Sequence, residues 1–325
     1  MRGHGETQMI TALGGGSGAA KFLKGLTGII PLSELTVIVN TADDMDLYGM
    51  RVSPDIDTII YRLSGSIDEK KGWGLRGDTF EFLGAAARFG FPTWFGLGDR
   101  DLATHLFRKA VSDGGGTLSE STSKIAQRFG LGEMRILPMS DDRVETWIET
   151  DAGEMHFQEY YIKHAMRPEV RGVKIKGARE ASPAPLLLDS IDGADLVIIC
   201  PSNPIISIGP ILEIKEVRER LVAAPGLKVA VSPLMRGKPL KGPADKLMRG
   251  LGMEASSTQV ARLYADFLDV LVIDRSDAGE AAAIEALGVS VFVTDTLIPD
   301  EQSSIRLSQE ILDFTKSLGQ RRASP

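Results

Sequence analysis

Cysteine is almost absent from this chain of 325 residues: Cys200 stands alone, so no intrachain disulfide can form and nothing marks an oxidising compartment. Long apolar runs are also missing, because runs such as residues 196–200 fall far below the ~20 residues that cross a bilayer. The first eight residues, MRGHGETQ, lack the apolar core of a signal peptide. We therefore expect a cytoplasmic protein that does not act at a membrane.

An excess of basic charge is missing as well. The chain has 37 lysines and arginines against 44 acidic residues, a net charge of −7, which argues against a protein that coats nucleic acid. Its four histidines show no ligand spacing and, with one cysteine, argue against a zinc site. No Gly-x-Ser-x-Gly elbow of a serine hydrolase is present. The apolar share of 43% and charged share of 25% are those of an ordinary soluble globular protein.

Glycine is the one residue in excess, at 35 residues, or about 11% against a usual ~7%. The first apolar run leads into a dense glycine turn, made of Gly14, Gly15, Gly16, Ser17 and Gly18. Such a turn can bring backbone N–H groups close to a phosphate at a helix N-terminus. The spacing does not fit a P-loop, whereas Gly14, Gly16 and Ala19 satisfy the looser dinucleotide pattern. We interpret residues 14–18 as a phosphate-binding loop, with a tight strand-to-helix turn as the alternative.

Apolar, β-branched runs recur along the chain, and turn residues and then a helical pattern follow each of them. The runs are Met9–Leu13, Leu35–Asn40, Leu196–Cys200, Lys228–Ser232, Val270–Ile273 and Val289–Val293. Runs without polar alternation are typical of strands covered on both faces, as in a parallel sheet. The helical patterns are Ala19–Leu26, Thr79–Phe89, Leu102–Val111, Leu118–Phe129, Leu212–Val222 and Ala278–Ala286. This alternation predicts a doubly wound, mainly parallel, Rossmann-like α/β sheet.

One segment interrupts the alternation of strands and helices. Val144–Thr150 and Glu154–Tyr161 flank an Asp-Ala-Gly turn and are typical of an antiparallel hairpin. We therefore expect a single α/β domain over residues 1–325, with residues 143–181 as an inserted subdomain.

Five carboxylates within fifteen residues begin at the end of the second apolar run: Asp43, Asp44, Asp46, Asp55 and Asp57. In open α/β sheets, ligands bind at this end of the strands. Carboxylate oxygens suit Mg²⁺, which usually takes one or two carboxylates together with substrate phosphates. Alternatively, the first two only form a loop and Asp55 caps a helix, which would explain part of the cluster. If a helix starts here, the side chains of Asp55 and Asp57 would point in directions about 200° apart around the helix axis.

Three further loops carry polar side chains. Arg100 lies just before a helical pattern and could contact a ligand or face solvent. Ser202 and Asn203 follow a strand and can bind a base, ribose or phosphate, or only shape the turn. The loop after residues 228–232 carries the basic residues Arg236, Lys238 and Lys241, which suit a diphosphate. Loops that follow parallel strands meet at one edge of the sheet, so we expect a single ligand site there.

Together these motifs resemble the 2-phospho-lactate transferases that make the deazaflavin cofactor coenzyme F-420. The matching strings, in family order, are LGGGSGAAKFLKGL, ELTVIVNTADD, SPDIDTIIYRL, WFGLGDRDLATH, PMSDDRVET, PSNPIISIGPIL and SPLMRGKPLKGPADKLM. The resemblance implies a reaction that joins the deazaflavin Fo to a lactyl- or enolpyruvyl-diphosphoguanosine donor. It would form a phosphodiester and release GMP, with Mg²⁺. The residues leave open whether the donor carries lactate, enolpyruvate or glycerate.

The resemblance also implies roles for individual residues. Asp43 and Asp55 would hold the metal, Asp57 would contact Fo or activate its alcohol, and Arg100 would belong to the acceptor site. The residues implied to face the guanosine diphosphate part of the donor, or in part Fo, are Gly14, Gly15, Gly16, Ser17, Gly18, Ser202 and Asn203. Lys238 would add a basic contact, and a homodimer is expected from closed symmetry.

Two alternatives come from other functional classes. A regulator of the same superfamily that binds nucleotide sugars shares the glycine loop and the aspartate pair. It would continue with a Gly-Gly-Ser-Ser-like loop, whereas this chain reads MDLYG and then SPDIDT. An NAD-dependent oxidoreductase would use Asp43 for the ribose, but no Tyr-x-x-x-Lys follows and the other carboxylates would be surplus. The sequence therefore favours the transferase.

Overall fold

The computed structural model describes residues 8–323 and is built on a seven-stranded sheet whose strand pairs are all parallel. Its order is β5–β2–β1–β9–β10–β13–β14. The strands are β1 (Ile10–Gly14), β2 (Leu35–Val39), β5 (Arg135–Pro138), β9 (Leu196–Ile199), β10 (Leu227–Val231), β13 (Val270–Asp274) and β14 (Ser290–Thr294). Six of them confirm the predicted runs to within two residues, and β5 is an additional edge strand.

The strand order creates a switch point at β1. The chain passes from β1 to its neighbour β2 on one side and later returns to β9 on the other side of β1. Ligands in open α/β sheets bind in the crevice outside the carboxyl ends of the strands at such a point. The glycine loop therefore lies where this topology places a ligand.

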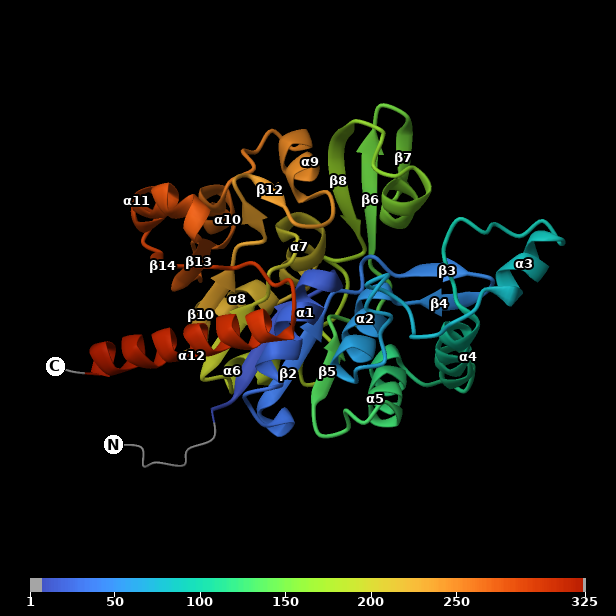
Figure 1. Ribbon diagram of the computed structural model, residues 1–325, viewed down its shortest axis with the longest axis horizontal. Coiled ribbons are helices and arrows are strands. Elements are labelled where there is room, and N and C mark those ends of the chain that lie inside the picture. The colour runs from blue at the N-terminus through green and yellow to red at the C-terminus, as the bar shows by residue number, and fades with distance from the viewer. Residues whose placement is uncertain (1–7, 324–325) are drawn as a thin grey trace.

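Helices cover both faces of the sheet. One face packs against α1 (Gly16–Leu26), α2 (Pro54–Leu63), α5 (Leu118–Arg128) and α12 (Glu301–Ala323), which crosses the front of the molecule in Figure 1. The other face packs against α6 (Leu187–Asp192), α7 (Gly209–Glu213), α8 (Val217–Ala223), α10 (Ser257–Tyr264) and α11 (Ala281–Glu285). Along β9, Ile198 faces the first layer and Ile199 the second. Strands buried on both faces confirm the doubly wound α/β fold.

Two predicted helices differ from those observed. The pattern at 212–222 forms two helices, α7 and α8, because the chain breaks where Glu216 takes the left-handed φ of +67°. The pattern at 278–286 begins as a 3₁₀ turn, η4 (Arg275–Glu280), and continues as α11. Thr117 is the N-cap of α5, because its Oγ1 accepts the backbone N–H of Glu120 at 3.1 Å.

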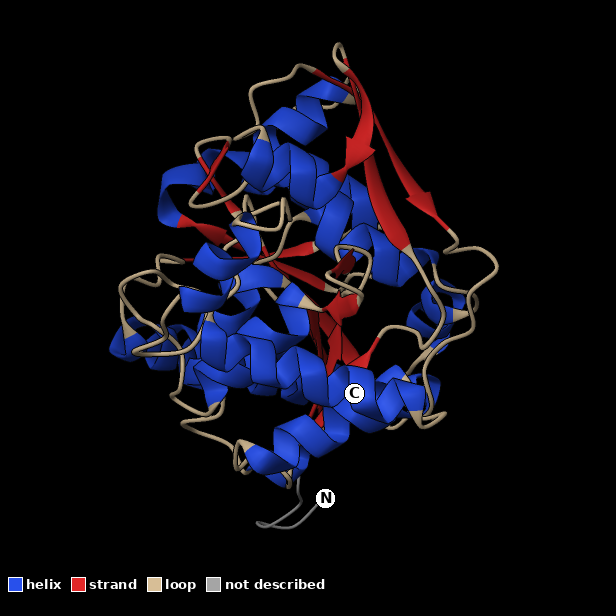
Figure 2. Ribbon diagram, turned by 90° about the vertical axis from the view of Figure 1, so that its right-hand side faces the viewer, coloured by secondary structure: helices blue, strands red, loops and turns tan. Residues whose placement is uncertain are grey.

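The segment that interrupts the alternation forms an antiparallel sheet of its own, in the order β7–β6–β8. Its strands are β6 (Glu145–Thr150), β7 (Gly153–His156) and β8 (Val170–Lys176). In Figure 2 these strands stand apart from the helix-flanked sheet. The predicted hairpin is confirmed, but its second strand ends at His156 and the chain turns into a π-helical turn, η2 (Glu159–Lys163). The backbone N–H of Gln158 donates to His156 Nδ1 at 3.2 Å at this turn. The division into one domain with an inserted subdomain stays a prediction.

The remaining elements lie in the connections between the layers. They are η1 (Leu32–Glu34), β3 (Met45–Leu47), β4 (Met50–Val52), α3 (Glu81–Ala87), α4 (Asp99–Asp113), η3 (Pro204–Ile208), β11 (Leu234–Met235), β12 (Lys238–Pro239) and α9 (Ala244–Gly250). The hairpin β3–β4 and α3 extend to the right in Figure 1. Within residues 8–323 no helix combines the length and apolar character needed to cross a membrane.

Candidate active site

The loops after β1, β2 and β9 meet around the glycine turn. Gly15 donates its backbone N–H to Ser202 Oγ at 3.3 Å, and Ser202 Oγ lies 3.1 Å from the Gly15 carbonyl oxygen. A Cβ atom on Gly15 would lie 2.2 Å from Asp55 Oδ2, and one on Gly18 would lie 2.2 Å from the carbonyl oxygen of Pro201. Glycine is therefore required at both positions by close packing, in addition to the sharp turn.

The turn presents the N-terminus of α1 at the same edge of the sheet. The helix begins at Gly16, whose φ of +72° lies in the left-handed region that glycine adopts readily. No side chain caps this helix, and its first turn contains no acidic residue. The positive end of the helix dipole is therefore available to an anion.

Asn40, at the end of β2, holds two buried carboxylates together. Its Nδ2 donates to Asp43 Oδ2 at 3.2 Å and to Asp55 Oδ2 at 3.0 Å. Its Oδ1 accepts the backbone N–H of Ala42 at 3.0 Å, which fixes the amide orientation. Asp43 is 4% exposed and Asp55 is 8% exposed. Sequence reasoning predicted the carboxylates but missed Asn40, although it directly follows the strand.

The environment of this pair disfavours negative charge. Burial, reinforced by the nearby Asp55 carboxylate, raises the pKa of Asp43 well above its usual value. Burial also raises the pKa of Asp55 to about 6, against the opposing effect of its hydrogen bond from Asn40. Asp43 Oδ1 is buried and accepts no hydrogen bond. The pair would be stabilised by a positively charged group beside it.

The other two buried carboxylates of the cluster already have such a group. Asp44 accepts from Arg51 Nε at 2.8 Å and from Ser53 Oγ at 2.7 Å. Asp57 forms a buried ion pair with Arg108. Throughout residues 8–323, by contrast, neither carboxylate bridged by Asn40 has an ion-pair partner. Only one pair within the acidic cluster therefore lacks a counter-charge.

Asp55 and Asp57 diverge at the start of α2, as expected for a helix start. Asp57 faces Arg108 and His105, whose Nδ1 lies 3.7 Å from Asp57 Oδ2. Arg108 Nη1 lies 3.1 Å from the same His105 nitrogen. His105 Nε2 lies 3.4 Å from Asp101 Oδ1. His105 is thus a buried structural residue. Its position three residues before Arg108 places both on one face of α4, and this spacing was the sequence signal that could have indicated their contact.

The antiparallel segment also reaches the carboxylate pair, which sequence reasoning missed. Gln158 Nε2 donates to the backbone carbonyl of Asp43 at 3.1 Å, across 115 residues of sequence. Thr146 lies beside the Asp43 carboxylate and lowers its pKa in opposition to burial. Burial raises the pKa of Tyr161, with a further contribution from Asp55. These contacts join segments that are far apart in the chain, so no local sequence pattern predicts them.

The remaining predicted residues take different positions. Ser202 is buried and directed to the glycine loop, and Asn203 caps η3 by accepting the backbone N–H of Ile205 at 3.0 Å. Arg100 is exposed at the start of α4 and donates to the Arg76 carbonyl oxygen at 2.9 Å. Lys238 is exposed in the hairpin β11–β12. Their roles toward a ligand stay predictions.

Cations from distant parts of the chain gather beside α1. Burial, together with the charges of Lys21 and Arg62, lowers the pKa of Lys241. Lys21 Nζ donates to the carbonyl oxygen of Ile298 at 3.2 Å, and neither lysine is paired with an acid within the described residues. This side of the glycine loop therefore favours an anionic ligand.

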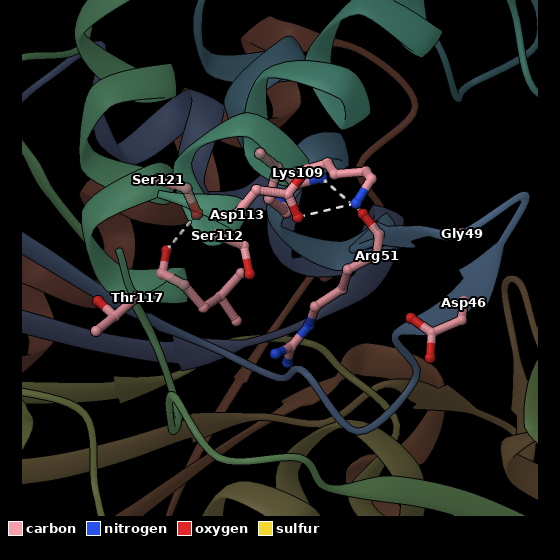
Figure 3. A pocket seen from close by; sticks show the side chains of 10 residues that line it. Asp46, Gly49, Arg51, Lys109, Ser112, Asp113, Thr117 and Ser121 are labelled. Atoms are coloured by element: carbon pink, nitrogen blue, oxygen red, sulfur yellow. Dashed lines mark hydrogen bonds and ion pairs between the residues drawn. The ribbon is translucent and has the colours of Figure 1, made fainter. Parts of the chain in front are cut away.

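A cavity of about 250 Å³ lies away from the carboxylate pair, between β3–β4, α4 and the start of α5 (Figure 3). Three cations line it, and each has an acidic partner: Arg51 with Asp44, Arg108 with Asp57, and Lys109 with Asp113 at 2.9 Å. Because every cation that lines the cavity is neutralised by a neighbouring acid, the cavity does not attract an anion.

The carboxylate pair fits a magnesium ion that takes its remaining ligands from substrate and water. Within the described residues, no group of three or more histidine, cysteine and acidic side chains could hold a metal by itself. Asp43 and Asp55 supply two carboxylates, and Mg²⁺ commonly binds through one or two of these plus substrate phosphates. The unpartnered buried Asp43 Oδ1 is the atom that such an ion would satisfy.

Comparison with known proteins gives one family. The family model for 2-phospho-L-lactate transferase CofD matches residues 10–298. A 2-phospho-L-lactate transferase from Methanosarcina acetivorans is 44% identical over 300 residues, which cover 92% of this chain and 97% of that protein. A phosphoenolpyruvate transferase from Kitasatospora aureofaciens is 41% identical over 316 residues, covering 95% and 98% of the two chains.

Among solved structures, a protein from Bacillus halodurans aligns with a TM-score of 0.66 and covers 94% of this chain and 100% of its own. The sequence identity between the two proteins is only 17%, so this likeness supports the α/β fold alone.

Proposed function

Because the chain belongs to the 2-phospho-L-lactate transferase CofD family and is therefore a transferase, we propose that it transfers a phospholactyl or phosphoenolpyruvyl group to the deazaflavin Fo. The donor is linked to guanosine diphosphate, and the product belongs to the biosynthesis of coenzyme F-420. The terminal hydroxyl oxygen of the ribityl arm forms a bond to the phosphorus that carries the lactyl or enolpyruvyl group. The bond between that phosphorus and GMP breaks, GMP leaves, and the hydroxyl loses its proton.

The observation that carries this proposal is the unneutralised carboxylate pair next to a helix N-terminus. Asp43 and Asp55 are buried and bridged by Asn40, and they lie beside the glycine loop. They would hold Mg²⁺, which would polarise the diphosphate and stabilise the charge that develops on the leaving GMP. An oxidoreductase that binds NAD would have no use for this second carboxylate.

The chain's own residues bind and orient the donor. Backbone N–H groups of residues 14–18 and the positive end of α1 would bind the diphosphate. Lys21 and Lys241 lie on the same side and add positive charge. Asn40 keeps both carboxylates in place, and Gln158 fixes the backbone of Asp43.

Asp57 and Arg100 would serve the acceptor. Asp57 Oδ2 is buried and accepts no hydrogen bond, whereas its other oxygen is held by Arg108. This free oxygen could accept a hydrogen bond from a hydroxyl of the ribityl arm and so orient it near the phosphorus. Arg100 is exposed at the start of α4 and could contact the outer part of the deazaflavin.

We further propose that the enzyme works in the cytoplasm as a homodimer.

The proposal is tested by incubating the purified protein with Fo, Mg²⁺ and either the lactyl or the enolpyruvyl donor. Chromatography should show GMP and the phosphodiester product forming in equal amounts, and chelation of Mg²⁺ should stop both. Asp43→Asn should lose most activity, by about 100-fold or more if the metal is lost.

Asp46→Asn is the matched control for this substitution. Asp46 belongs to the same acidic cluster, but its side chain is 68% exposed and paired with Arg143 at the surface. This variant should keep nearly full activity. Full activity of Asp43→Asn, or full activity in excess chelator, would rule out the metal role.

A further inference from the structure

The turn that follows β7 lies against the carboxylate pair. Gln158 comes just before η2, is buried, and donates its Nε2 to the Asp43 carbonyl oxygen at 3.1 Å. Within the turn, the backbone N–H of His164 donates to the carbonyl oxygen of Glu159, five residues earlier, at 2.8 Å. This is the hydrogen bond of a π-helical turn, a feature that is frequent at functional sites. The antiparallel segment thus brings a short, defined turn to the candidate active site.

Two adjacent tyrosines of this turn have opposite surroundings. Tyr160 is buried in an apolar cluster with Ile148 and Leu247, and its hydroxyl has no hydrogen-bond partner there. Tyr161 is half-buried. Burial raises the pKa of its phenol, and the nearby Asp55 carboxylate raises it further. The Tyr161 hydroxyl forms no hydrogen bond within residues 8–323, so it is a free polar group close to a proposed metal ligand.

The ring of Tyr161 is held in a fixed orientation. It stacks on the buried ring of Phe157, with the centroids 5.5 Å apart and the ring planes 10° from parallel. The end of the turn is also held, because Lys163 Nζ lies 5.9 Å from the centroid of the Trp94 ring, in the loop before α4. A hydroxyl on a ring held in this way is preorganised, because little side-chain freedom is left to lose when it binds a ligand.

The same tyrosine lies near the loop that follows β9. Tyr161 and Ile205 pack against one apolar cluster. Ile205 belongs to η3, which begins two residues after Ser202, the side chain that contacts Gly15 in the glycine loop. Tyr161 is therefore close to both loops that would enclose the donor's phosphates. We expect a phosphate that lies between the glycine loop and Asp55 to be within reach of the Tyr161 hydroxyl.

We infer that the Tyr161 hydroxyl donates a hydrogen bond to a nonbridging oxygen of the phosphoryl group that is transferred; the inference rests on the proposed function. A tyrosine, with an ordinary pKa of about 10, is protonated at neutral pH and can donate. In phosphoryl transfer, the charge of the transition state is spread over the oxygens of the transferred group, and a preorganised donor stabilises it. Tyr161 keeps its proton throughout, and the proton of the attacking hydroxyl does not pass through it.

The test replaces Tyr161 by phenylalanine, which removes only the hydroxyl and keeps a ring to stack on Phe157. Tyr160→Phe is the matched control, since it makes the same change at the adjacent residue, whose hydroxyl lies in the core. GMP release is measured with Fo, Mg²⁺ and the lactyl or enolpyruvyl donor. Tyr161→Phe should lower kcat by about 100-fold, as expected for loss of one preorganised donor, with each KM within about twofold of wild type. Tyr160→Phe should match wild type.

Two further measurements distinguish this role from a structural one. Calorimetric titration of Mg²⁺ in the presence of GDP should give the same affinity for wild type and Tyr161→Phe, because the hydroxyl is not a metal ligand. Thermal melting of both variants should match wild type, because neither change alters the packing of the rings.

The outcomes separate this inference from the proposed function. Full kcat in Tyr161→Phe would overturn the inference, and so would a loss that excess Mg²⁺ restores, because the hydroxyl would then act on the metal. A raised KM for Fo at unchanged kcat would also overturn it, since the hydroxyl would then bind the acceptor. If wild-type protein releases no GMP from either donor, the proposed function is wrong and this inference falls with it.

Discussion

Replacing Asp55 by asparagine should stabilise the metal-free protein at alkaline pH, even though Asp55 is a proposed metal ligand. Burial raises the pKa of Asp55 from 3.8 to about 6. The folded state then binds the proton more tightly than the unfolded state, so stability is lost as the pH rises through about 6. The full shift corresponds to about 3 kcal/mol above that pH. The side-chain oxygen of the new asparagine can still accept from Asn40.

The assay is urea denaturation in chelator at two pH values, near 4 and near 8. Asp55→Asn should exceed wild type by up to about 3 kcal/mol near pH 8, where Asp55 is ionised. Near pH 4 the two proteins should differ little, because Asp55 is then protonated in the folded state. Adding Mg²⁺ at pH 8 should stabilise wild type more than the variant, since binding to the folded state adds stability by mass action.

Asp57→Asn is the matched control, two residues further along the same helix. Here the same chemical change removes the partner of a buried guanidinium, Arg108, so stability near pH 8 should fall by about 3–5 kcal/mol. The two variants should therefore shift in opposite directions. An Asp55→Asn protein that is no more stable than wild type near pH 8, or equally more stable at both pH values, would refute the reasoning.

Three further substitutions test the packing around the site. Gly18→Ala places a Cβ 2.2 Å from the Pro201 carbonyl oxygen, so it should displace that loop, weaken GDP binding by about tenfold or more and lower the melting temperature. Gln158→Ala removes the hydrogen bond to the Asp43 carbonyl, so calorimetry should show Mg²⁺ affinity reduced by about tenfold with the fold intact. Thr117→Ala removes the α5 cap and should cost about 1 kcal/mol in urea denaturation without affecting GMP release; a loss of activity would contradict a purely structural role.

The central strands of the sheet could be predicted because they are buried on both faces, and the partly exposed edge strand β14 was predicted as well, whereas β5 and β8 were missed. β1, β2, β9, β10 and β13 are continuous apolar runs, a pattern that identifies central parallel strands. The edge strand β5 is four residues long, starts with an exposed arginine and ends with proline. β8 alternates buried and charged positions in the antiparallel sheet. Strands as short as β5 or as charged as β8 provide too weak a periodic signal on their own, whereas the half-exposed β6 and β7 were predicted from the turn between them.

The candidate site could be located from the sequence, but the sequence did not show which of its carboxylates are neutralised by a cation. Acidic density after β2 predicted the place, and helical geometry predicted that Asp55 and Asp57 diverge. Which carboxylates remain unneutralised depends on guanidinium groups brought in by folding: the partner of Asp57 lies 51 residues away. The sequence alone does not show which of the four buried aspartates lack a cation, and burial makes an unpaired carboxylate costly. The metal proposal therefore belongs to Asp43 and Asp55 because the fold has supplied every other buried carboxylate of the cluster with its own cation.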